Sequence, residues 1–195
     1  MSLKQTNIAE FTTIITLDEA KRQAYQSTSN NDTDLTAILT SLIKTAVLSC
    51  ENYTWRQVVQ ADYEYRLDRF PSGILELPKP PVISVESVQY VSMEGNQTLD
   101  AANYRVDLIS EPARLEPVSG WPSAKSQIDA VTITFTTGYN NDNKVPEPLK
   151  QGMLMLIKYL YENRDAVAIS NSLAVHELPF GVKWMWDPYS LRRFT

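Results

Sequence analysis

The stretch that decides the fold runs from Leu35 to Tyr53 and reads LTAILTSLIKTAVLSCENY. Its apolar side chains recur at intervals of three or one residues, so they form one continuous face of an α-helix. That face comprises Leu35, Ile38, Leu39, Leu42, Ile43, Ala46, Val47, Cys50 and Tyr53. Asp32, Thr33 and Asp34 supply an N-cap and negative charge for the positive end of the helix dipole. The pattern predicts one long amphipathic helix that another element must cover.

Two further helices are predicted, one on each side of this helix in the sequence. Thr16 is followed three residues later by Glu19, the spacing of a capping box, and a short helix is expected to about Gln26. Prolines and an acid at residues 145–148 suit the first turn of a third helix. Its apolar face comprises Leu149, Met153, Leu156, Ile157, Leu160 and Tyr161. We expect the first two helices to form an αα-hairpin and the faces of the long and third helices to pack together.

The segment at residues 57–144 has the period of antiparallel strands. Val131, Ile133 and Phe135 alternate with threonines, and a similar alternation runs from Val59 to Leu67. This segment holds seven basic and twelve acidic side chains, so the acidic excess of the chain lies here. The predicted fold class is α+β. Residues 1–56 and 145–195 are expected to form a helical core with an aromatic tail, and residues 57–144 an inserted antiparallel β segment.

Composition argues against most catalytic classes. The 195 residues carry a net charge of −5, which does not suit a protein that grips DNA phosphates. One cysteine, Cys50, excludes an intrachain disulfide, and we expect it to be a buried core residue. One histidine, His176, excludes a histidine-paired relay or cluster. The glycines are too far apart for a phosphate loop. No catalytic residue, metal site or cofactor is therefore predicted. The absence of a long apolar run predicts a soluble protein without a membrane span.

The C-terminal tail is dense in large apolar groups. Its candidate assembly residues are Leu178, Pro179, Phe180, Trp184, Trp186 and Tyr189. Trp184 and Trp186 have the same parity and would face one side of an extended chain. Such aromatic side chains are enriched at interfaces. The pattern leaves two interpretations open: the tail covers the helical core of its own subunit, or it anchors a neighbouring copy.

The order of several short motifs resembles the head–tail connector, or adaptor, proteins of tailed bacteriophages and related prophages, in the longer variant with a β insertion. The motifs include TLDEAK at 16–21, ENYTWR at 51–56, DRFP at 68–71, LPKPPV at 77–82, LDAANYRV at 99–106, VPEPLKQ at 145–151 and ELPFGV at 177–182. Gly152 departs from the small helix former expected there. It costs the helix about 1 kcal/mol or permits a close helix approach.

The resemblance implies a structural role in the virion. Such proteins form a ring of about twelve copies under the portal, which is a closed cyclic assembly. The ring extends the DNA channel and docks neck or tail-completion proteins. DNA passes through without sequence-specific binding, which an acidic or neutral lumen favours because it repels phosphates. The protein is expected in the host cytoplasm during assembly and then at the head–tail junction.

Two other classes remain open from the sequence. One is a monomeric binding module with a ligand face on the β segment, which a mass measurement in solution would distinguish from a ring-former. The other is a small virion enzyme that uses carboxylates alone, such as a glycosidase-like module. Two acids in one cleft, one with a raised pKa, would favour it.

Overall fold

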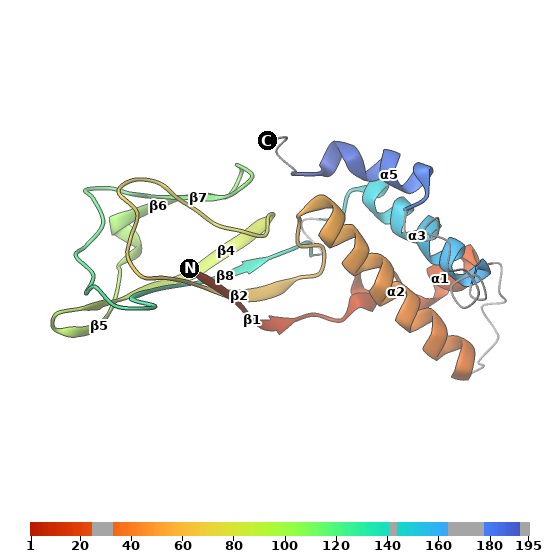
Figure 1. The fold of residues 1–195 in the computed structure, drawn as a ribbon, viewed down its shortest axis with the longest axis horizontal. Coiled ribbons are helices and arrows are strands. Elements are labelled where there is room, and N and C mark those ends of the chain that lie inside the picture. Colours follow the sequence, from red (N-terminus) through yellow and green to blue (C-terminus); the bar gives the residue numbers. More distant parts are fainter. Residues whose placement is uncertain (25–32, 141–143, 164–177, 192–195) are drawn as a thin grey trace, which may run out of the picture. The chain divides into compact units, whose positions relative to one another are not determined.

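The computed structural model describes residues 1–24, 33–140, 144–163 and 178–191, and the chain divides into two compact units (Figure 1). The β unit consists of Met1–Ala9 and Val59–Asp142, and the helical unit of Glu10–Val58 and Asn143–Thr195. The predicted α+β class is confirmed. The expectation that residues 1–9 belong to the helical core is wrong, because they form a strand of the β unit.

The helical unit is centred on α3 (Glu147–Glu162), which contacts α1 (Leu17–Gln23), α2 (Thr33–Thr54) and α5 (Phe180–Trp186). Short 3₁₀ turns precede α1 at Phe11–Thr13 and follow α5 at Asp187–Tyr189. The predicted capping box opens α1: the Thr16 hydroxyl accepts from the Glu19 amide, and the Glu19 carboxylate accepts from the Thr16 amide. Helices α1 and α2 touch, as expected for an αα-hairpin, and the residues that connect them, 25–32, lie outside the described residues.

The predicted packing of α2 on α3 is confirmed. On α2, Leu39, Ile43 and Val47 are fully buried, and Leu42 is half-buried beside them. On α3, Leu149, Met153 and Ile157 are fully buried. Burial of one apolar stripe on each helix removes both from water, which is the main source of stability for such a pair. Cys50 lies in the same core, as expected.

By length and composition, α2 is the one described helix that could cross a bilayer. Eight of its residues are nevertheless buried inside the helical unit, among them Glu51. Its other side carries polar side chains that include Lys44 and Asn52. We interpret α2 as the core helix of this unit, because its apolar stripe already has a partner in α3.

The β unit contains two antiparallel sheets. The larger has the strand order β1-β2-β8-β4-β5, and the smaller has the order β3-β7-β6. The strands of the larger sheet are β1 (Ser2–Ile8), β2 (Ala61–Leu67), β4 (Val82–Ser92), β5 (Gly95–Thr98) and β8 (Val131–Thr137). Those of the smaller sheet are β3 (Leu75–Glu76), β6 (Tyr104–Asp107) and β7 (Arg114–Pro117). The sequence Met93-Glu94-Gly95-Asn96 is typical of a hairpin turn, and a hairpin there joins β4 to β5.

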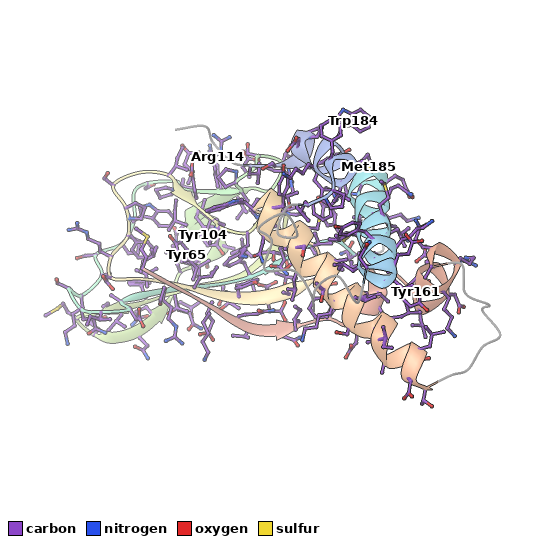
Figure 2. The ribbon with its side chains drawn as sticks, turned by 45° about the vertical axis from the view of Figure 1, so that its right-hand side comes forward. Tyr65, Tyr104, Arg114, Tyr161, Trp184 and Met185 are labelled. Carbon is purple, nitrogen blue, oxygen red and sulfur yellow. The ribbon has the colours of Figure 1, made fainter. Side chains whose placement is uncertain are left out.

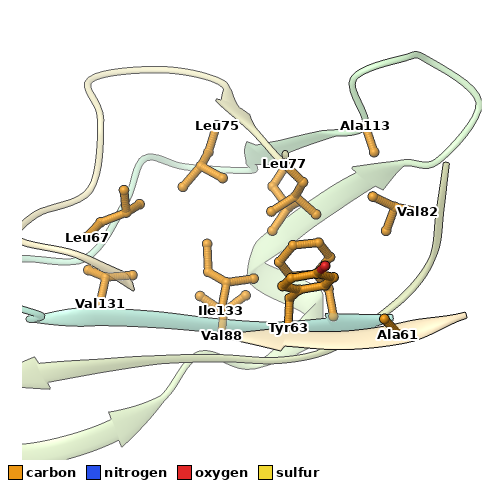
Figure 3. Packing of buried hydrophobic residues seen from close by; sticks show 12 residues of the cluster. Ala61, Tyr63, Leu67, Leu75, Leu77, Val82, Val88, Ala113, Val131 and Ile133 are labelled. Carbon is orange, nitrogen blue, oxygen red and sulfur yellow. The ribbon is translucent and has the colours of Figure 1, made fainter. Parts of the chain in front are cut away.

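One face of the larger sheet forms the core of the β unit, as the alternating pattern predicts (Figure 3). Tyr63, Ile133 and Phe135 contribute from this sheet, while Leu75 and Leu115 contribute from the smaller one. The Tyr63 and Phe135 rings are stacked with centroids 6.1 Å apart. Of the smaller sheet, the sequence indicates only β6, through the alternation of Tyr104, Val106 and Leu108 with polar residues. Strands β3 and β7 have two and four residues, too few to show a period.

Candidate assembly surface

The tail forms a helix, α5, instead of the extended segment that the shared parity of its tryptophans assumed. Successive residues in an α-helix are rotated by about 100°, so positions four apart share a face and positions two apart lie on opposite faces. Val182 and Trp186 are four apart, and both are fully buried. Phe180 and Trp184 are also four apart, and they are 83% and 68% exposed. The expectation that Trp184 and Trp186 face one side is therefore wrong.

Trp186 anchors α5 to the core of its own unit. Its indole Nε1 donates to the Leu149 carbonyl oxygen at 3.2 Å, and its ring lies 5.8 Å from that of Tyr53, centroid to centroid. A buried tryptophan whose N–H has a partner contributes a large apolar area without an unsatisfied donor. For Trp186, the structure selects the first of the two interpretations of the tail, that it covers the core of its own subunit.

Gly152 explains how the indole fits. A Cβ placed on Gly152 would lie 2.3 Å from Trp186 Nε1, which is closer than any real contact. The sequence left open whether Gly152 only destabilises its helix or permits a close approach by another element. The structure shows the close approach, by the Trp186 indole. The lack of a side chain at Gly152 also lets the Leu149 carbonyl one turn earlier receive the indole N–H.

We expect Gly152→Ala to destabilise the protein by about 1–3 kcal/mol, although alanine favours a helix by about 1 kcal/mol. The added methyl group would push the Trp186 indole out of its site and break its bond to Leu149. Urea denaturation measures the change. A variant as stable as the natural protein, or more stable, would show that the indole does not depend on Gly152.

The segment after α5 is tied to the end of α2. The Arg56 Nε donates to the Tyr189 carbonyl at 2.7 Å, and the Leu191 amide donates to the Thr54 carbonyl at 3.0 Å. The Tyr53 hydroxyl also donates to the Asp187 carboxylate. Tyr189 is half-buried in this arrangement, as are Leu178 and Pro179 at the other end of α5. These contacts hold α5 in one orientation on its unit.

The outer face of α5, defined as Phe180 and Trp184, is thereby presented to solvent on a fixed helix. Figure 2 shows Trp184 pointing away from the other helices of its unit. Trp55 is another exposed aromatic of this unit, at 65%, and sequence reasoning missed it. It follows the last residue of α2 in a left-handed conformation, with φ 62°. Its exposure could have been predicted from its position just after the end of the helix, where a side chain no longer follows the apolar face.

The structure gives Cys50 a structural role. Cys50 is fully buried, and burial raises the pKa of its thiol to about 12, so the reactive thiolate does not form near neutral pH. His176 lies outside the described residues. Among the residues that the structure does describe, no three His, Cys, Asp or Glu side chains converge in a way that could hold a metal ion.

One pair of acids does come together, on the polar face of the larger sheet. The Thr136 hydroxyl lies 2.7 Å from Asp62 Oδ1 and 2.9 Å from Glu86 Oε1. The Glu86 side chain is exposed and that of Asp62 is half-buried, so both carboxylates are open to water. An open sheet face gives them neither the enclosure nor the apolar lining of a catalytic cleft. We interpret the pair as part of the polar surface.

No family model matches this sequence, and no curated protein does. Solved structures do resemble it over its whole length. A chain from the neck of an empty gene transfer agent particle, computed with C6 symmetry, has a TM-score of 0.79 at 22% identity, and the match covers 100% of this chain and 98% of that one. Chains from the virion of a native gene transfer agent particle and from the native neck, computed with C12 symmetry, have TM-scores of 0.75 and 0.69 at 19% and 20% identity, with the same coverage. The chain therefore has the fold of these phage-like neck and virion proteins.

Proposed function

We propose that this protein is a structural component of the neck of a phage-like particle. The observation that carries the proposal is the match of both units, in one chain, to neck chains of gene transfer agent particles across nearly their full length. Fold alone does not determine function. The motif order that resembles phage connector proteins is a second, separate line of support.

More specifically, the protein forms a ring of about twelve copies under the portal and offers a docking face to neck or tail-completion proteins. A cyclic ring needs a heterologous contact, in which one surface of each copy meets a different surface of the next. The outer face of α5 supplies an anchor of the right kind, because Phe180 and Trp184 are large, rigid and held by a helix that is fixed to its own core. Trp186, being buried, supports this face from behind and does not reach a neighbour.

The charge of the chain suits a conduit for DNA. The whole chain carries a net charge of −5, and the exposed carboxylates of the β unit include Asp68, Glu86 and Glu94. Phosphates are repelled by such a surface, so the duplex slides through without being held. The role needs neither a cofactor nor a catalytic group, and it places the protein at the head–tail junction after assembly in the host cytoplasm.

We expect Trp184→Ala and Phe180→Ala to weaken ring formation or portal docking by roughly 2 kcal/mol each, which is about 30-fold in affinity, while the subunit stays folded. The physical reason is that each change removes a large apolar side chain from the contact without touching the core. Light scattering and electron microscopy of the purified variants measure ring formation. The fraction of particles that carry tails, counted by electron microscopy, measures tail joining.

Tyr159→Ala is the matched control, because Tyr159 is an aromatic residue exposed elsewhere on the helical unit. The control should assemble like the natural protein. Normal assembly of both α5 variants would place the interface on another surface and remove α5 from the proposal.

A further inference from the structure

The larger sheet ends in two free edges. Its strand order places β1 at one edge and β5 at the other. Among the described residues, no strand pairs with the outer side of either. All residues of β1 and β5 are exposed, on both faces of the sheet. Both strands therefore present backbone N–H and C=O groups that another strand can pair with.

Each edge carries only part of the protection that natural proteins give to free edges: β1 has one lysine and a bulge, and β5 is short. Such edges are usually shielded by a very short strand, by lysine or proline, by inward charges, by bulges or by a covering element. Neither strand contains proline, β5 has no charged side chain, and β1 has one, Lys4. The pairing of β1 with β2 is regular from Ser2 to Gln5 and is then broken by a bulge before Asn7. The regular part of β1 is thus four residues long, which is the length of β5.

The direction of the strands decides how copies can join. Every neighbouring pair in the sheet is antiparallel. The first and fifth strands of such a sheet run the same way, so β5 of one copy meets β1 of the next as a parallel pair when all copies face the same direction. This contact is heterologous and leaves a free edge at each end, so it can be repeated until a ring closes. Pairing of β1 with β1 would be isologous and would stop at a dimer.

We propose that β5 of one copy pairs with β1 of a second copy of this chain, so that the larger sheets of neighbouring subunits join into one continuous sheet around the ring. The inference rests on the proposed function, because the symmetric ring supplies the second copy. This interface is separate from the one proposed for the outer face of α5. It also gives β1, which buries no side chain, a second strand to pair with. Main-chain hydrogen bonds would supply affinity, as in other cases where a strand is added to a sheet edge.

Cysteine cross-linking tests the pairing. Gln5→Cys on β1 and Thr98→Cys on β5 place one thiol on each edge, and a short bis-maleimide then links thiols that lie side by side. The natural cysteine does not interfere, because Cys50 is fully buried. The full-length protein is cross-linked within particles that contain it and is then run on a denaturing gel. Unchanged melting of the double variant shows that it is folded. The pair Leu3→Cys and Asn96→Cys repeats the test two positions earlier on each strand.

The double variants should give a ladder of three or more linked chains, whereas each single variant, with one thiol per chain, should give none above a dimer. Gln5→Cys with Ile109→Cys is the matched control, because Ile109 is 95% exposed but lies outside both edges, and it should give no ladder. A closed ring without a ladder in both double variants would overturn the edge pairing and leave the proposed function standing. Efficient dimers from Gln5→Cys alone would overturn it in favour of β1–β1 pairing. Absence of the chain from the neck would overturn both proposals.

Discussion

Trp186→Ala is expected to lower the free energy of unfolding by about 3–5 kcal/mol, the range for removing a fully buried large aromatic side chain. The indole fills the space between α5, α3 and the end of α2, and its loss would leave a cavity against Gly152 and Tyr53. The Leu149 carbonyl would also lose a side-chain donor. Chemical denaturation of the purified protein measures this change.

Trp184→Ala is the matched control for this experiment, since it removes the same side chain from the same helix two residues away. Its side chain is 68% exposed, so the stability should change by no more than about 0.5 kcal/mol. The two variants should separate two properties: Trp186→Ala loses stability, and Trp184→Ala loses assembly. Equal losses of stability would contradict the opposite orientation of the two residues on α5.

Phe135→Ala is expected to cost about 3–5 kcal/mol in the β unit. Phe135 is fully buried on β8, the central strand of the larger sheet, and its ring stacks on Tyr63 of β2. The cavity would open between the two sheets, whose core side chains are already packed against one another and cannot fill it. Hydrogen exchange should show lost protection in β2, β4 and β8.

Ile109→Ala is the control for Phe135, because Ile109 is an apolar residue in the loop after β6 that is almost wholly exposed. Its removal should leave stability and exchange unchanged. A loss below about 1 kcal/mol for Phe135→Ala would mean that the two sheets do not share one packed core.

The elements that the sequence predicted well are those whose cause is local. The apolar stripe of α2, the capping box at Thr16 and the alternation around Ile133 each place the responsible residues within a few positions of one another. The packing of α2 on α3 followed as well, because two amphipathic helices in one small unit have few other ways to bury their faces. The division into helical and β parts followed from the change of period.

The elements that were missed depend on partners far away in the sequence. Strand β1 buries no side chain, so its sequence shows no alternation of apolar and polar residues. It forms only because it can pair with the edge of β2. The parity of Trp184 and Trp186 suggested a shared face because an extended tail was assumed. The role of Gly152 requires knowing that Trp186, more than thirty positions later, packs against it. For the assembly surface, the sequence named Phe180 and Trp184 but did not separate them from the buried Trp186.

The most direct test of the neck assignment is an electron cryomicroscopy reconstruction of particles that contain this protein, calculated without imposed symmetry. We expect a closed ring of about twelve copies at the head–tail junction, with the outer face of α5 against a neighbouring protein. A chain that is absent from the junction, or present there as isolated monomers, would contradict it.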